Sequence, residues 1–143
     1  MAVTSTPIYP QTLTTTIATI TSATGTNNVT VYTAGANGSK LEAIYVTNTG
    51  VSKIMGIYLN QSSTAYAIGC VVIATEAGTT SGAGVVPTQN LLSSLGNFGC
   101  LNLDSNGNPY LYLSSGTSVQ VNVTVTLAGG GVTIQAIGVG EDF

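Results

Sequence analysis

The sequence predicts an all-β protein: a single-domain β-sandwich of the jelly-roll kind, preceded by an extended N-terminal arm. Apolar residues recur at every second position in several segments, and short runs rich in Gly, Asn and Asp separate these segments. No stretch shows the 3.6-residue period of a long amphipathic helix. A chain of 143 residues without a visible repeat suits one domain. We place the arm at residues 1–11 and the sandwich at residues 12–143.

The arm is predicted from its prolines. Pro7 and Pro10 lack the N–H group that a central strand donates, and proline favours an extended, preset backbone. Ile8 and Tyr9 lie between them as apolar side chains in a segment of mostly small polar residues. An extended segment with such anchors suits docking on a neighbouring subunit or on another protein. The alternative is an arm that folds back along its own sandwich.

Upstream of residue 119, turn-forming sequences separate a series of apolar segments that we predict to be strands. Segments 41–46 and 54–59 are apolar on both faces, which is typical of strands at the centre of a sheet. Residues 91–95 are expected to form one turn of helix. The predicted upstream strands are residues 13–20, 29–33, 41–48, 54–59, 65–73, 100–103 and 110–113.

The clearest strand covers residues 119–127, where four valines and a leucine alternate with polar residues. This period of two places one face in a core and the other against water or polar partners. The alternation resumes at Val132, Ile134 and Ala136, after a run of three glycines that is typical of a turn. We therefore expect the two segments to pair as a hairpin.

Titratable side chains are scarce, with two lysines, five acidic residues and no histidine. General acid–base catalysis depends on such groups, and the common serine triad needs a histidine. We therefore expect no enzyme activity, no catalytic residues and no cofactor. Two lysines without any arginine provide no basic surface for phosphates, so no nucleic-acid partner is expected.

The sequence contains no predicted membrane span and no visible secretory signal. Its longest apolar stretch, residues 68–74, is far shorter than the roughly 20 residues of a membrane helix. The N-terminus lacks a basic region followed by an apolar one. We expect synthesis in a cytoplasm and no membrane partner.

One segment partly matches a calcium loop. Residues 104–108, DSNGN, supply the first three ligand positions, but Pro109 interrupts the loop and Ser115 stands where a bidentate Glu is needed. An Asx-rich hairpin turn explains these residues, and no metal site is expected. Cys70 and Cys100 are expected to be free buried thiols, with a disulfide between them as the alternative.

Three segments resemble a family of small tailed-bacteriophage virion proteins: TPIYPQT at residues 6–12, VTVYTAGANGSKLEAIYVTNTG at 29–50 and IQAIGVGEDF at 134–143. Members of this family share a TPIFPQT-like start, a TAGANGT-like turn before an I-x-V strand, and a GGDF or GGDY terminus. Glu141 stands where a second glycine is usual. The resemblance implies a virion component on the capsid surface, most simply a capsid decoration (cement) protein without catalytic residues.

The expected partners are the major capsid protein or other virion proteins, together with further copies of this chain, a homotrimer being preferred. We predict that the contact with the capsid or with other subunits involves Pro7, Ile8, Tyr9, Pro10 and Phe143. A neck, tail-tube or head-fibre protein of the virion is the alternative. A carbohydrate-binding module or adhesin is more distant: tyrosines on the predicted strands permit it, whereas the missing signal and the absence of Trp weigh against it.

Overall fold

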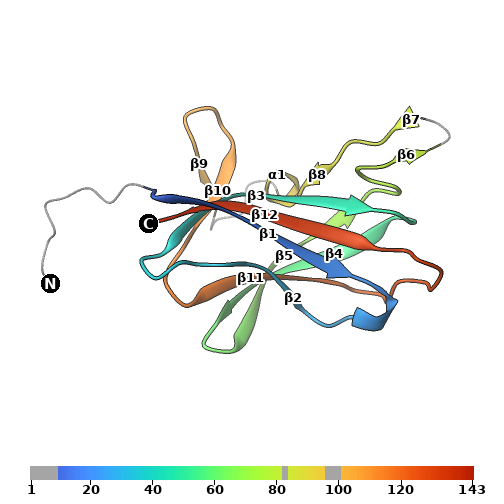
Figure 1. Ribbon diagram of the computed structural model, residues 1–143, viewed down its shortest axis with the longest axis horizontal. Coiled ribbons are helices and arrows are strands. Elements are labelled where there is room, and N and C mark those ends of the chain that lie inside the picture. Colours follow the sequence, from blue (N-terminus) through green and yellow to red (C-terminus); the bar gives the residue numbers. More distant parts are fainter. Residues whose placement is uncertain (1–9, 82–83, 96–100) are drawn as a thin grey trace, which may run out of the picture.

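The computed structural model describes residues 10–81, 84–95 and 101–143, and it shows two antiparallel sheets packed face to face (Figure 1). The predicted all-β sandwich is thereby confirmed. Pro7, Ile8, Tyr9 and Cys100 lie outside the described residues. The contact arm and the pairing of the two cysteines therefore stay predictions.

The larger sheet has the strand order β1-β12-β3-β10-β9, and the short strand β8 pairs with β3 away from this path. As predicted for a segment that is apolar on both faces, β3 has neighbours on both sides. The strands are β1 Thr12–Ile20, β3 Ser39–Asn48, β8 Gln89–Asn90, β9 Asn102–Leu103, β10 Pro109–Leu113 and β12 Ile134–Asp142.

The smaller sheet has the order β2-β11-β4-β5, with β4 between two neighbours as its sequence predicts. A separate hairpin joins β6 to β7. The remaining elements are β2 Val29–Thr33, β4 Lys53–Gln61, β5 Thr64–Ile73, β6 Thr80–Ser81, β7 Gly84–Val85, β11 Thr117–Val123, the 3-10 helix η1 Ser22–Thr24 and the helix α1 Leu91–Ser94.

The predicted hairpin between residues 119–127 and the segment from Val132 onward is wrong. β11 pairs with β2 and β4 in the smaller sheet, whereas β12 pairs with β1 and β3 in the larger one. Leu127 is buried in the connection that crosses between the sheets. An alternating pattern predicts which face of a strand is buried. A hairpin of the two strands and their placement in separate sheets would both bury that face against the same core, so the pattern does not distinguish them.

The space between the sheets is filled by one continuous core of apolar side chains, including the ring of Tyr32, and both sheets contribute to it. The predicted helical turn is confirmed in α1, which contributes Leu91 and Leu92 to this core. The Asn90 side chain caps the helix by accepting a hydrogen bond from the Leu92 N–H at 3.1 Å. Within the described ranges, no helix has the length and hydropathy to cross a membrane.

Candidate docking surface

The outer face of the larger sheet, turned away from the smaller sheet, carries exposed apolar side chains. Ile17 of β1, Ile137 of β12 and Tyr45 of β3 lie directly opposite one another in the strand register. Ile17 is 66% exposed and Tyr45 is 42% exposed. Leu13, at 68% exposed, and half-buried Val139 extend this group, and we call the five residues the outer apolar patch.

The sequence of β1 contains the signal for this patch. Ala18 and Ile20 point into the core, and their positions have even numbers. Leu13 and Ile17 have odd numbers, so the period of two places them on the opposite face. The prediction identified the strand and missed that its apolar residues fall on both faces.

A bulge in β3 shapes the surface next to the patch. Leu41 pairs with Gly140 and Ala43 pairs with Val139, which are consecutive in β12, so Glu42 is an additional residue in β3. Glu42 lies on the same outer face as Lys40, which precedes it by two residues, and the insertion also brings the next residue, Ala43, to this face. The Lys40 Nζ donates to Glu42 Oε1 at 2.7 Å, and this bond raises the pKa of Lys40.

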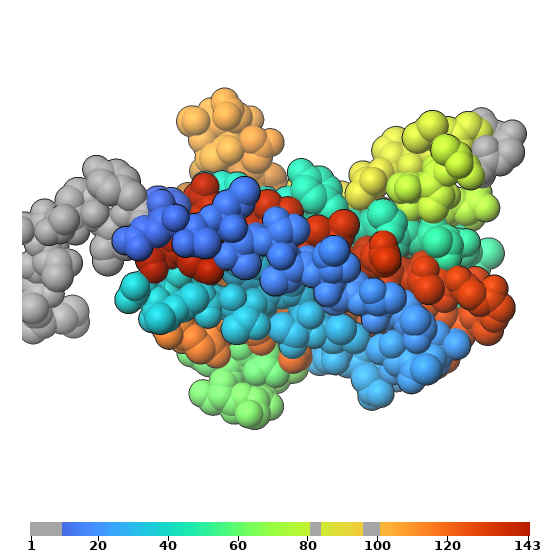
Figure 2. Space-filling model, viewed as in Figure 1, coloured from blue at the N-terminus to red at the C-terminus, as the bar shows by residue number. Residues whose placement is uncertain are grey.

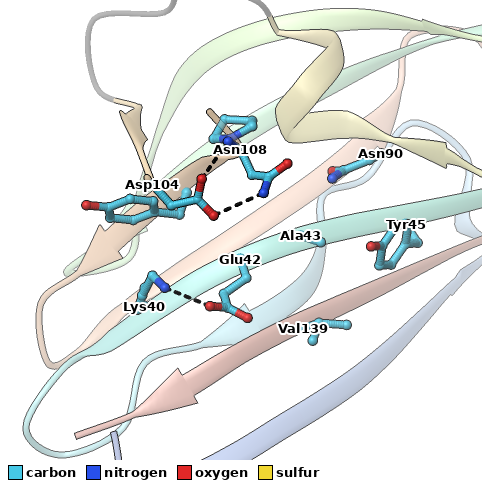
Figure 3. A pocket seen from close by; sticks show the side chains of 10 residues that line it. Lys40, Glu42, Ala43, Tyr45, Asn90, Asp104, Asn108 and Val139 are labelled. Atoms are coloured by element: carbon cyan, nitrogen blue, oxygen red, sulfur yellow. Dashed lines mark hydrogen bonds and ion pairs between the residues drawn. The ribbon is translucent and has the colours of Figure 1, made fainter. Parts of the chain in front are cut away.

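A pocket of about 290 Å³ opens over this part of the sheet (Figure 3). Glu42 and Tyr45 of β3 form part of its floor, and Asn108 and Tyr110 of the β9–β10 hairpin form a wall. We call it the outer pocket. The Lys40 ammonium lies 5.0 Å from the centre of the Tyr110 ring, within cation–π distance. The sequence carried no signal for this pocket, because its parts are far apart in the chain.

The wall of the outer pocket is held by the turn at residues 104–108. Asp104 Oδ1 accepts hydrogen bonds from the N–H groups of Asn106 and Asn108 at 2.8 Å, and Oδ2 accepts one from Asn108 Nδ2 at 3.0 Å. The Asn108 side chain is the main cause of the lowered pKa of Asp104. The carboxylate therefore closes its own Asx turn, as expected. The described part of the chain holds no group of three or more metal-ligating side chains.

The C-terminal strand is fastened by a network that we call the C-terminal clamp: Thr14, Tyr32, Ser39 and Asp142. Asp142 Oδ1 accepts from Ser39 Oγ at 2.5 Å and from the Tyr32 hydroxyl at 3.0 Å, while Oδ2 accepts from Thr14 Oγ1 at 2.9 Å. The bond from Ser39 is the main cause of the lowered pKa of Asp142, and burial opposes it. These residues come from β1, β2, β3 and β12, so the clamp joins both sheets.

Two of the predicted contact residues lie within the described chain, and the structure brings them to one corner. The Gln11 N–H donates a hydrogen bond to the Asp142 carbonyl at 2.8 Å. This bond brings the neighbouring residues in the chain, exposed Pro10 and Phe143, to the same corner. Phe143 is half-buried, and its ring centre lies 6.2 Å from that of Tyr112, which is 57% exposed. Both residues therefore border the outer face of the larger sheet.

Cys70 is exposed on β5, which contradicts its predicted burial. Val71 and Ile73 point into the core, so the alternation of the strand turns Cys70 outward. The tyrosines also differ in exposure: Tyr32 is fully buried, whereas Tyr66 is 58% exposed.

Comparison of this chain with protein-family models, with curated proteins and with solved structures found no match.

Proposed function

We propose that this chain is a non-enzymatic structural protein of a bacteriophage virion, a capsid decoration protein that binds and stabilises the head lattice. Its partners would be the major capsid protein or other virion proteins, and further copies of itself, as a trimer by preference. The outer apolar patch carries the proposal, because a contiguous exposed apolar surface on a protein marks an interaction site.

The chemistry of the outer face supports docking to a protein surface. Its polar side chains are mostly Thr, such as Thr15 and Thr19, and its charged pair Lys40–Glu42 is already joined. Burying a hydroxyl is inexpensive when it finds a hydrogen bond, whereas burying an unpaired charge costs several kcal/mol. The remaining charge on this face, among the described residues, is Glu141, which lies opposite Leu13 and Lys40 in the strand register, so a partner that covers it would have to supply a pairing group there.

The strand order supports the finer expectation of a jelly roll. One sheet holds β1, β12, β3 and β10, and the other holds β2, β11, β4 and β5. Pairs that follow each other in the chain, such as β1 and β2 or β11 and β12, are thus divided between the sheets. Jelly rolls occur in viral capsid domains and in lectins, although a fold alone does not decide function.

Replacing Tyr45 by Asp should weaken binding to capsids that lack this protein by at least tenfold, because the loss of a central aromatic contact is among the costliest at interfaces. Co-sedimentation with such capsids measures the effect. The matched control is Tyr66→Asp, since Tyr66 is 58% exposed but lies on β5 of the other sheet. Equal binding by the two variants would contradict docking through the outer face, and absence of the chain from purified virions would contradict the virion role.

The outer pocket favours a second candidate function, binding of a neutral sugar. Tyr45 and Tyr110 offer rings with polar tips. Lys40 is paired with Glu42, so the described lining offers no unpaired cation to an anionic ligand, and the Asp104 carboxylate accepts its hydrogen bonds within its own turn. Uncharged hydroxyl groups are the ligand chemistry that this arrangement suits.

Saturation-transfer NMR with a panel of neutral monosaccharides tests the second candidate. We expect transfer to at least one sugar with the native protein, and loss of that signal in Tyr110→Ala because the wall of the pocket is removed. Tyr66→Ala, which alters an exposed ring on the other sheet, should keep the signal. No transfer with the native protein, or equal signals from both variants, would reject a sugar site in this pocket.

A further inference from the structure

The edge of β1 is an open strand edge. Within the described residues, β1 pairs with β12 on one side and with no strand on the other. Its nine residues form nine consecutive pairs with β12 without a bulge, and they include no charge and no proline. Figure 2 shows the atoms of β1, in blue, running along the front of the molecule. Proteins ordinarily protect such edges with charges, prolines or bulges, because the unpaired backbone groups can bind another strand.

The other long edge strand, β5, is protected in two ways. The Gln89 side chain donates to the Val72 carbonyl at 2.9 Å and accepts from the Ala74 N–H at 3.2 Å, as a neighbouring strand would. A register shift also interrupts the pairing of β5 with β4 between Ile57 and Tyr58. Among the residues that the structure describes, neither device is present on β1.

We infer that β1 is a self-association edge, which pairs antiparallel with β1 of a second copy about a two-fold axis at Thr15. The absence of charge points to a second copy as the occupant. At a two-fold axis each side chain meets the same part of an identical strand, so a charge near the axis would meet its own like charge. A strand without any charge is free of this repulsion.

The positions of the apolar side chains select the register. A two-fold axis perpendicular to the sheet keeps outward residues outward on both copies. With the axis at Thr15, Leu13 lies opposite Ile17 of the second copy, and Ile17 opposite its Leu13, so both exposed side chains gain an apolar partner. An axis at Thr14 or Thr16 would instead place each of them opposite a polar residue.

This contact would join two six-stranded sheets into one and would make the two outer apolar patches continuous across the axis. It is isologous, so it would add to the proposed trimer contact, which would lie elsewhere on the chain, and would not replace it. The inference concerns the free protein and does not need the proposed capsid role, so its test needs no capsid.

Cysteine cross-linking tests the inference in a Cys70→Ser, Cys100→Ser background. Thr15 and Thr19 are both exposed on the outer face of β1. Thr15→Cys would place two thiols directly opposite each other at the axis, within the Cα separation of a disulfide. In the same register the Thr19→Cys thiols would lie about 26 Å apart along the strands.

Under mild oxidation at high micromolar concentration, we expect Thr15→Cys to form a covalent dimer at least ten times faster than Thr19→Cys. Adding Ile17→Asp to Thr15→Cys should slow cross-linking by a similar factor, whereas adding Val72→Asp, an exposed change on β5, should not. Equal rates for the two cysteine variants, or no dimer from Thr15→Cys, would overturn the inference.

Discussion

Replacing Gly140 by alanine is expected to lower the free energy of unfolding by about 3 kcal/mol, a typical cost of forcing atoms into a packed site. A Cβ at this position would lie 2.7 Å from the Tyr32 hydroxyl and 2.8 Å from the backbone oxygen of Lys40. The Tyr32 ring has no free space to move into, because it is fully buried and its hydroxyl is bound to Asp142.

Gly129→Ala is the matched control, because a Cβ there would meet nothing within 4 Å. We expect this variant to stay within about 0.5 kcal/mol of the native protein. Urea denaturation measures the free energy of unfolding of both variants. Thermal unfolding of Gly140→Ala should show a midpoint about 10 °C below that of the native protein. A Gly140→Ala protein as stable as Gly129→Ala would mean that Tyr32 does not pack against β12 as described.

The second large effect is expected from the C-terminal clamp. Asp142→Ala removes the acceptor of three hydroxyl groups and leaves the hydroxyl of buried Tyr32 without that partner. Hydrogen bonds to a charged group are stronger than neutral ones, but Asp142 is only half-buried, so we expect a loss of about 2 kcal/mol at neutral pH. Thr14→Val removes one hydrogen-bond donor, so its free energy of unfolding should fall by less than that of Asp142→Ala.

The same residue gives stability a dependence on pH. The pKa of Asp142 is lower in the folded protein, so its contribution is fully present above the ordinary carboxyl pKa of about 4. It is lost as the pH falls through the lower, folded-state pKa. The stability difference between the native protein and Asp142→Ala should therefore be smaller at about pH 2 than at about pH 6. Urea denaturation at both pH values measures it, and an unchanged difference would contradict an ionised clamp.

The sequence determined the class of the fold and most of its local structure. Alternation of apolar residues predicted strands, and segments that are apolar on both faces predicted the central positions of β3 and β4. The helical turn at residues 91–95 and the Asx turn at residues 104–108 also follow from neighbouring residues, because a cap or a turn is closed by side chains a few positions away.

Tertiary structure alone decided which elements meet. It separated β11 from β12, which a local turn signal had paired, and it turned Cys70 outward. It also built the outer pocket from β3 and the β9–β10 hairpin, and it brought Asp142 to Thr14 across nearly the whole chain. A period of two shows that a strand has one buried face, but choosing its neighbours depends on contacts between distant residues, which no local pattern encodes.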